Sequence, residues 1–196
     1  MIQAITNRRS IRKYEKRDVP RSMIEEILKA GILAPSSKNR QPWRFVVVTG
    51  NAKTEMLAEM KKGLEREAQI PLLPESAKHL KAAEYTLTIM EQAPVAIFIV
   101  NALGIDINAQ ITPEERIYEI CNAQSIGAAI ENMTLTATDL GLGSLWICDT
   151  YFAYKELSEW LQADGELFAA MTVGYADEAP SARPRKDMRD IVEWKN

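Results

Sequence analysis

The stretch APSSKNRQPW, residues 34–43, joins a segment with helical periodicity to a short apolar run. It holds two prolines, two serines, two amide side chains and a tryptophan. Such a loop is stiff and dense in hydrogen-bonding groups, which suits recognition of a flat polar ligand. The composition is equally compatible with a plain helix-to-strand connector in which Trp43 enters the core.

Helical and strand patterns extend outward from this loop. Upstream, Pro20 and the capping-box spacing of Ser22 and Glu25 predict a helix start. Downstream, Phe45–Val48 and Val95–Val100 are apolar runs typical of buried strands, and the second is apolar at every position. The remaining elements are expected as helices over 53–68, 76–92 and 113–140 and as strands over 144–148 and 168–173. Helices on both faces of a central mixed sheet give an α+β fold.

The helix expected from residue 113 has the clearest boundaries. Thr112 and Glu115 form a capping box around Pro113, and Gly141 is suited to ending the helix. Its middle, residues 123–129, is rich in small side chains. Such a surface permits close helix–helix approach, either inside a core or across a two-fold axis.

Composition limits the classes of function. The 196 residues are enough for one domain, 1–196, and the formal net charge of −3 argues against a general nucleic-acid binder. No apolar run approaches the ~20 residues needed to span a bilayer, and the first residues lack a signal-peptide pattern, so we expect a cytoplasmic protein. The two cysteines form no CxxC pair and His79 is the single histidine, so no metal site is expected.

Two arginine clusters lie near opposite ends of the chain. If the N-terminal cluster is extended, Arg8, Ser10 and Arg12 point to one side, because side chains alternate along an extended backbone. In the C-terminal cluster, Arg183 precedes a proline and is biased toward extended backbone, so it shares a side with Arg185. Paired guanidiniums suit a phosphate. Each cluster alone could equally be a solvated basic patch.

Four segments, in this order, resemble the nitroreductase family of FMN-dependent oxidoreductases. They are RRSIR at 8–12, APSSxNxQPW at 34–43, GLGS at 141–144 and RPR at 183–185. The match extends over nearly the whole chain, and the second segment is the most specific. The resemblance implies a nitroreductase-like α/β/α sandwich with a central mixed sheet. It also implies an intertwined homodimer with two FMN sites at the subunit interface.

The resemblance further implies which residues contact FMN. Arg8 would bind the phosphate together with Arg183 and Arg185. Arg12 would lie near the pyrimidine edge of the flavin ring, where reduction places negative charge. The loop at 35–39, with Pro35, Ser36, Ser37 and Asn39, would come from the other subunit. The full expected set is Arg8, Arg9, Ser10, Arg12, Pro35, Ser36, Ser37, Asn39, Gln41, Trp146, Ile147, Cys148, Arg183 and Arg185.

The activity implied is ping-pong hydride transfer from NADH or NADPH, through FMN, to a nitroaromatic, quinone or enone. No catalytic side chain is named, because the cofactor performs the chemistry and water can supply the proton. No GxGxxG follows a strand, so a separate nicotinamide-binding domain is not expected. The alternatives are a flavin-binding store or sensor without turnover, and docking of an anionic partner on the N-terminal basic segment.

Two features depart from better-known family members. Cys148-Asp149 stands where a Glu-Gly pair is common, and Thr86 is the nearest candidate for a helix asparagine that others carry. Cys148 is expected to be a small apolar neighbour of the ring rather than a redox thiol. The segments 61–80 and 104–112 are expected to cover the substrate pocket.

Overall fold

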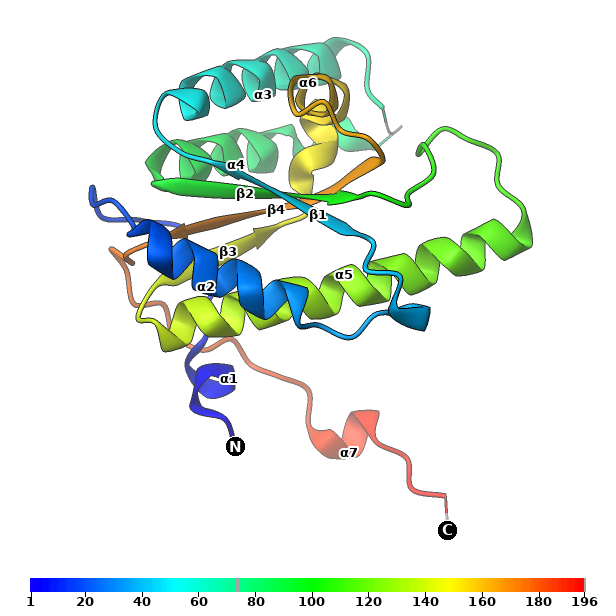
Figure 1. Cartoon of the computed structure of the whole chain (residues 1–196). Coiled ribbons are helices and arrows are strands. Elements are labelled where there is room, and N and C mark those ends of the chain that lie inside the picture. The colour runs from blue at the N-terminus through cyan, green and yellow to red at the C-terminus, as the bar shows by residue number, and fades with distance from the viewer. Residues whose placement is uncertain (73–74, 196) are drawn as a thin grey trace.

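The computed structural model describes residues 1–72 and 75–195 (Figure 1). Its centre is a four-stranded sheet in the order β1-β2-β4-β3. The part of the expected pocket cover at residues 73–74 lies outside the described residues. The strands are β1 (Trp43–Val48), β2 (Val95–Asn101), β3 (Gly143–Ile147) and β4 (Glu166–Gly174).

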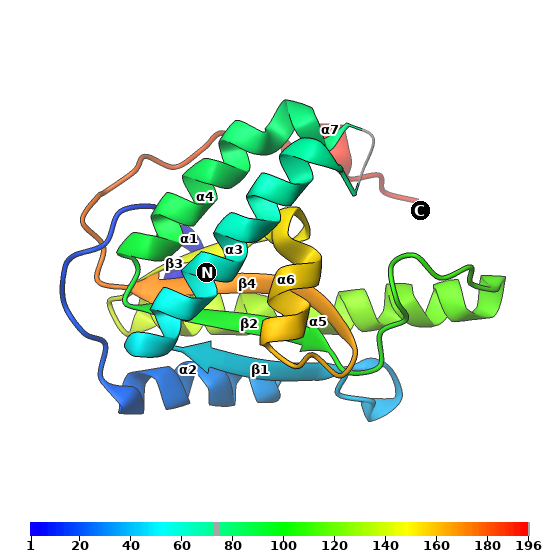
Figure 2. The same ribbon diagram turned by 90° about the horizontal axis from the view of Figure 1, so that it is seen from above.

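Helices cover both faces of this sheet, as expected (Figures 1 and 2). One face carries α3 (Asn51–Gln69), α4 (Leu80–Gln92) and α6 (Tyr154–Trp160), and the other carries α2 (Arg21–Ile32) and α5 (Pro113–Asp139). Shorter elements are α1 (Gln3–Asn7), α7 (Met188–Ile191) and the 3₁₀ turns η1 (Ser37–Asn39), η2 (Ser76–His79) and η3 (Asp149–Ala153). The α/β/α sandwich is therefore confirmed.

The sheet differs from the mixed sheet expected, because all three strand pairs are antiparallel. The helical hairpin of α3 and α4 returns the chain to the end of the sheet where β1 stopped, so β2 runs back beside β1. The strands β2 and β3 have the same direction, but β4 lies between them. Parallel pairing in the described residues is limited to a single bridge between Ser10 and Ser144.

Strand β2 forms the centre of both cores. Ile97 and Ile99 pack with α2 and α5, whereas Ala96 and Phe98 pack with α3, α4 and α6. Alternate side chains of a strand point to opposite faces, so an uninterrupted apolar run fits a strand covered on both sides. All seven residues of β2 are buried.

The capping signals had different outcomes. At α5, Thr112 Oγ1 accepts from the Glu115 amide at 3.2 Å, while the Thr112 amide donates to Glu115 Oε2 at 2.7 Å. Gly141, with φ of 75°, follows the end of α5 as predicted. The capping box predicted at Ser22 is wrong, because α2 already begins at Arg21 after Pro20.

Candidate functional site

The N-terminal segment 8–15, here called the strap, lies between β3 and the chain that follows β4. The Ile11 amide donates to the Ser144 carbonyl and the Glu15 amide to the Tyr175 carbonyl, each at 2.9 Å. The Asp177 amide donates back to the carbonyl of Lys13, also at 2.9 Å. These bonds fix an extended strap at the edge of the sheet.

A buried tyrosine, Tyr14, connects the strap to the central sheet. The Tyr14 hydroxyl lies 2.9 Å from the Ile11 carbonyl and 2.8 Å from Thr172 Oγ1 on β4. Burial raises the pKa of Tyr14 well above its usual range, so the phenol stays protonated and can serve as a donor. The hydroxyl therefore ties the strap to the central sheet.

The two arginine clusters meet at one cavity of about 440 Å³. Arg8, Arg9, Ser10 and Arg12 come from the α1–strap region, and Arg183 and Arg185 come from the segment after β4. Among the described residues that line this cavity, five are arginines and none is acidic. We call it the arginine cavity. Its charge makes it an anion-binding surface.

The guanidiniums of this cavity bond mainly to backbone carbonyls: Arg9 Nη1 donates to the Thr6 and Arg8 carbonyls, each at 2.8 Å. Arg8 Nε lies 3.5 Å from Glu131 Oε1 on α5, and Arg12 Nη1 donates to the Ser10 carbonyl at 3.1 Å. The Nε atom of Arg9 is buried without a hydrogen-bond partner among the described residues. An unpaired buried donor beside other cations favours a bound anion.

A second cavity, of about 320 Å³, begins where Arg12 lines both spaces. We call it the flat cavity. One of its walls is the C-terminal end of β3, and the other is α4. The flat cavity is lined by Arg12, Ala82, Tyr85, Thr86, Ile89, Leu145, Trp146, Ile147, Cys148 and Asp149. The expected ring contacts Trp146, Ile147 and Cys148 are thus brought together with Arg12.

The thiol in this cavity is not activated. Burial, with a smaller contribution from Asp149, raises the pKa of Cys148. A reactive cysteine needs a lowered pKa, because the thiolate is the nucleophile. The expectation that Cys148 is an ordinary neighbour of the site agrees with this environment.

The loop at 34–43 lines neither cavity within one chain. Its conformation is nevertheless tightly defined: the Ser37 amide donates to Ser125 Oγ on α5 at 3.2 Å, and the Gln41 amide donates to Ser36 Oγ at 3.1 Å. Lys38, Asn39 and Gln41 have φ between 47° and 54°. Non-glycine residues in this region are strained by on the order of 1–3 kcal/mol each, and such strain gathers at functional sites. The structure leaves Pro35, Ser36, Ser37, Asn39 and Gln41 apart from the arginines.

Two acidic residues of the site were missed by sequence reasoning. Glu178 Oε1 accepts from the Arg12 amide at 2.5 Å, and Glu131 pairs with Arg8. Each is more than 100 residues from its partner, so no spacing rule could reveal the pair. The positive φ values of the loop at 34–43 did have a sequence signal, since it contains Asn39 and Asn is among the residues that tolerate positive φ.

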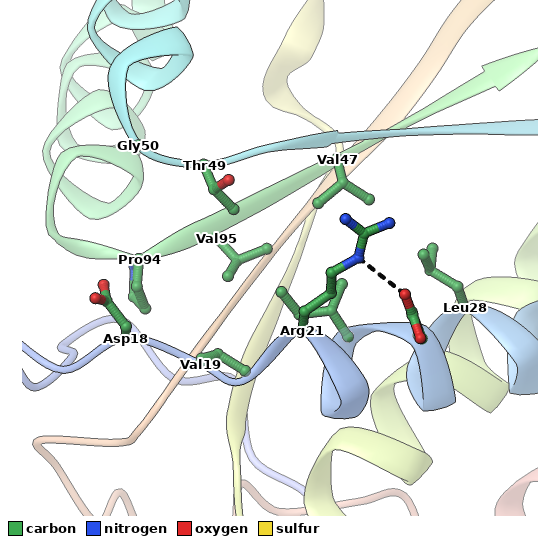
Figure 3. A pocket seen from close by; sticks show the side chains of 11 residues that line it. Asp18, Val19, Arg21, Leu28, Val47, Thr49, Gly50, Pro94 and Val95 are labelled. Carbon is green, nitrogen blue, oxygen red and sulfur yellow. Dashed lines mark hydrogen bonds and ion pairs between the residues drawn. The ribbon is translucent and has the colours of Figure 1, made fainter.

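A separate cavity of about 530 Å³ lies at the start of α2, beside the edge strand β1 (Figure 3). Val19, Val47 and Val95 provide apolar walls, and Arg21 at its rim pairs with Glu25 at 2.9 Å. None of the predicted FMN contacts lines it. It is therefore distinct from the arginine and flat cavities.

In residues 1–72 and 75–195, no three His, Cys, Asp or Glu side chains gather in a way that could hold a metal ion. Over the same residues, no helix has both the length and the apolar character needed to cross a bilayer.

Comparison with known proteins agrees with this architecture. A family model described as "Nitroreductase family" matches residues 5–175. The Bacillus subtilis protein YfhC, which is named for an NAD(P)H nitroreductase activity, is 28% identical over 189 residues, covering 95% of this chain and 89% of YfhC.

Solved structures show the same fold. A nitroreductase-like protein from Desulfovibrio desulfuricans, solved in complex with FMN, superposes with a TM-score of 0.71 at 28% identity, covering 99% of this chain and 96% of the other. An FMN- and NADPH-dependent nitroreductase from a Sphingopyxis strain gives a TM-score of 0.76 at 20% identity, covering 98% and 97%. The resemblance seen in four sequence segments is confirmed, and the chain belongs to the nitroreductase family of oxidoreductases.

Proposed function

We propose that this chain binds FMN and passes electrons from NADH or NADPH to a small acceptor by a ping-pong reaction. The observation that carries the proposal is the meeting of the two arginine clusters at one cavity. A doubly charged phosphate accepts several charge-assisted bonds, and guanidiniums present donors in a fixed planar array. The unpartnered Arg9 Nε fits such an anion.

In this proposal, different residues of the chain contact the phosphate and the ring of FMN. Arg8, Arg183 and Arg185 would hold the phosphate, with Arg9 and Ser10 beside them. FMN, when bound, would supply the hydride-accepting and hydride-donating chemistry. The flat cavity would receive the ring along the end of β3, and the shared position of Arg12 would place a fixed cation at its edge. Such a cation stabilises negative charge that develops on reduction.

Purified protein should be yellow, and NADH or NADPH should bleach the flavin bands in the absence of oxygen. Menadione or a nitroaromatic should then restore the bands, because the oxidised nicotinamide leaves before the acceptor enters. Absorbance spectroscopy in an anaerobic cuvette checks both half-reactions. A yellow protein that neither nicotinamide bleaches would be a flavin store or sensor. Protein that cannot be reconstituted with FMN would contradict the whole proposal.

We also propose that the functional unit is an intertwined homodimer. The strained loop at 34–43 has no ligand-facing role within one chain, while α5 runs beyond the sheet in both views (Figures 1 and 2). Helix α5 also exposes Ile117 and Ile120. The C-terminal segment leaves the domain and exposes Ile191 and Trp194 (Figure 1). A second copy would cover these apolar side chains.

Light scattering of the flavin-loaded protein should give the mass of two chains. A sharper test co-expresses an Arg8→Ala chain with an Asn39→Ala chain and purifies the mixed dimer through two tags. If each site takes arginines from one chain and the loop from the other, one of the two sites is intact and binds FMN with wild-type affinity at half stoichiometry. A flavin-loaded monomer, or a mixed dimer without an intact site, would contradict the shared-site arrangement.

A further inference from the structure

The flat cavity holds two formally charged side chains of opposite sign. Among the described residues that line it, Arg12 and Asp149 are charged and the others are neutral. Asp149 begins η3, directly after the strand end at Cys148. The lining of the cavity thus includes a cation from the strap and an anion from the turn after β3.

The carboxylate of Asp149 lies within hydrogen-bond distance of the opposite wall. The Thr86 hydroxyl on α4 lies 3.3 Å from Asp149 Oδ2, and Thr86 is buried. The same hydroxyl lies 3.1 Å from the Ala82 carbonyl. The hydroxyl has one proton, so it donates either to this carbonyl or to the carboxylate; when it donates to the carboxylate, the contact joins the two walls of the cavity.

The negative charge is not neutralised by a neighbouring cation. No Lys, Arg or His nitrogen lies within 4.0 Å of the Asp149 carboxylate in the part of the chain that is described. Arg12, which lines the same cavity, donates to the Ser10 carbonyl. The charge is felt at the strand end, since Asp149 contributes to the raised pKa of Cys148.

We propose that Asp149 sets the charge specificity of the acceptor site: it admits neutral or cationic acceptors and rejects anionic ones. The inference rests on the proposed function and adds one assignment to it: the ring lies at the Arg12 side of the flat cavity, so that Asp149 faces the space left for the second substrate. Tyr85, which is half exposed in the same cavity, offers an aromatic face to a flat neutral acceptor. Repulsion between like charges weakens with ionic strength, so the discrimination should be largest at low salt.

The test uses Asp149→Asn in the holoenzyme, with Asp164→Asn as the matched control. Asp164 is exposed after α6 and lines neither cavity, so its variant loses the same formal charge elsewhere. The acceptors are 1,4-naphthoquinone and its 2-sulfonate. For Asp149→Asn, the ratio of kcat/KM for the sulfonate to kcat/KM for the neutral quinone should rise about tenfold at low salt, whereas Asp164→Asn should leave this ratio unchanged. Added salt should raise the wild-type rate with the sulfonate and should not raise the rate of the variant, in which Arg12 remains and the repulsion is gone.

A binding measurement separates this inference from turnover. Benzoate and benzamide are titrated into the oxidised holoenzyme and followed by the shift of the flavin absorbance bands. Benzoate should bind Asp149→Asn about tenfold more tightly than wild type, and benzamide equally to both. The sulfonate-to-quinone ratio of kcat/KM and the benzoate-to-benzamide ratio of affinity could both be the same in wild type and Asp149→Asn. In an active enzyme, that result overturns the role of Asp149 and leaves the proposed function standing. Protein that binds no FMN overturns the proposed function, and this inference with it.

Discussion

Arg8→Ala and Arg185→Ala should each weaken FMN binding by about 1.5–3 kcal/mol, roughly ten- to 150-fold, the scale of a charge-assisted hydrogen bond. The two residues lie at opposite ends of the sequence and line the same cavity. Each loss therefore removes a different contact to one phosphate, and the double variant should bind more weakly than either single variant. Titration of apoprotein with FMN, followed by quenching of flavin fluorescence, gives the dissociation constants.

Arg189→Ala is the matched control. Arg189 lies in α7 on the same C-terminal segment, pairs with Asp187 at 3.0 Å and lines neither cavity. Its variant should keep wild-type affinity. Glu131→Gln removes the acidic partner of Arg8 instead of the arginine itself. Because Arg8 is then free to bind the phosphate, FMN affinity should be equal or higher. Wild-type affinity in both Arg8→Ala and Arg185→Ala would show that the phosphate lies elsewhere.

Sequence signals were reliable where the cause is local. The Thr112 capping box, the end of α5 at Gly141 and the apolar run of β2 each depend on neighbours within a few residues, and all were found in the structure. At α2, two local signals competed. The helix begins directly after Pro20, and the Glu25 carboxylate pairs with Arg21 rather than reaching back to a cap.

Long-range geometry was the part that residue patterns could not supply. Alternation predicted that Arg183 and Arg185 share a side, but nothing in the pattern said that they face the strap. The resemblance to a family supplied the shared target, and the cavity places the two clusters together. The antiparallel sheet order and the Glu178–Arg12 contact depend on pairings between distant segments, for which the sequence has no local signature.

A cluster of acidic residues, here called the acidic corner, lies at the start of β4, around Glu166. Glu166, the first residue of β4, is half-buried, and burial raises the pKa of its carboxyl to about 7, with repulsion from Glu119 and Asp106 adding to the effect. Glu119, whose own pKa is raised by burial, lies within 3.3 Å of Asn101 Nδ2. Burial, and then the charge of Glu166, also raise the pKa of Tyr154, so the phenol facing the corner stays neutral. The corner thus holds carboxyl groups close together; Arg40 acts to lower the pKa of Glu119, whereas burial and two other carboxylates raise the pKa of Glu166.

Glu166→Gln should therefore stabilise the protein at pH 8 by about 1–2 kcal/mol and have little effect at pH 4.5. The folded carboxyl, with a pKa of about 7 against 4.5 for the ordinary group, binds its proton more tightly than the unfolded one. The tighter proton binding adds to the free energy of unfolding. This contribution is complete below pH 4.5 and is lost as the pH rises through 7. The full shift would correspond to about 3.4 kcal/mol, which solvent screening of a half-exposed group reduces.

Urea unfolding of the wild type and of Glu166→Gln at pH 4.5, 6 and 8 gives this difference directly, because the other titrating groups are common to both proteins. Glu65→Gln, which changes an exposed carboxylate on α3, should show a difference that does not vary over this range. If Glu166→Gln shows the same flat profile, ionisation of Glu166 costs the folded state nothing. The corner would then be open to water, because burial and repulsion from Glu119 and Asp106 would otherwise disfavour the charged form of Glu166.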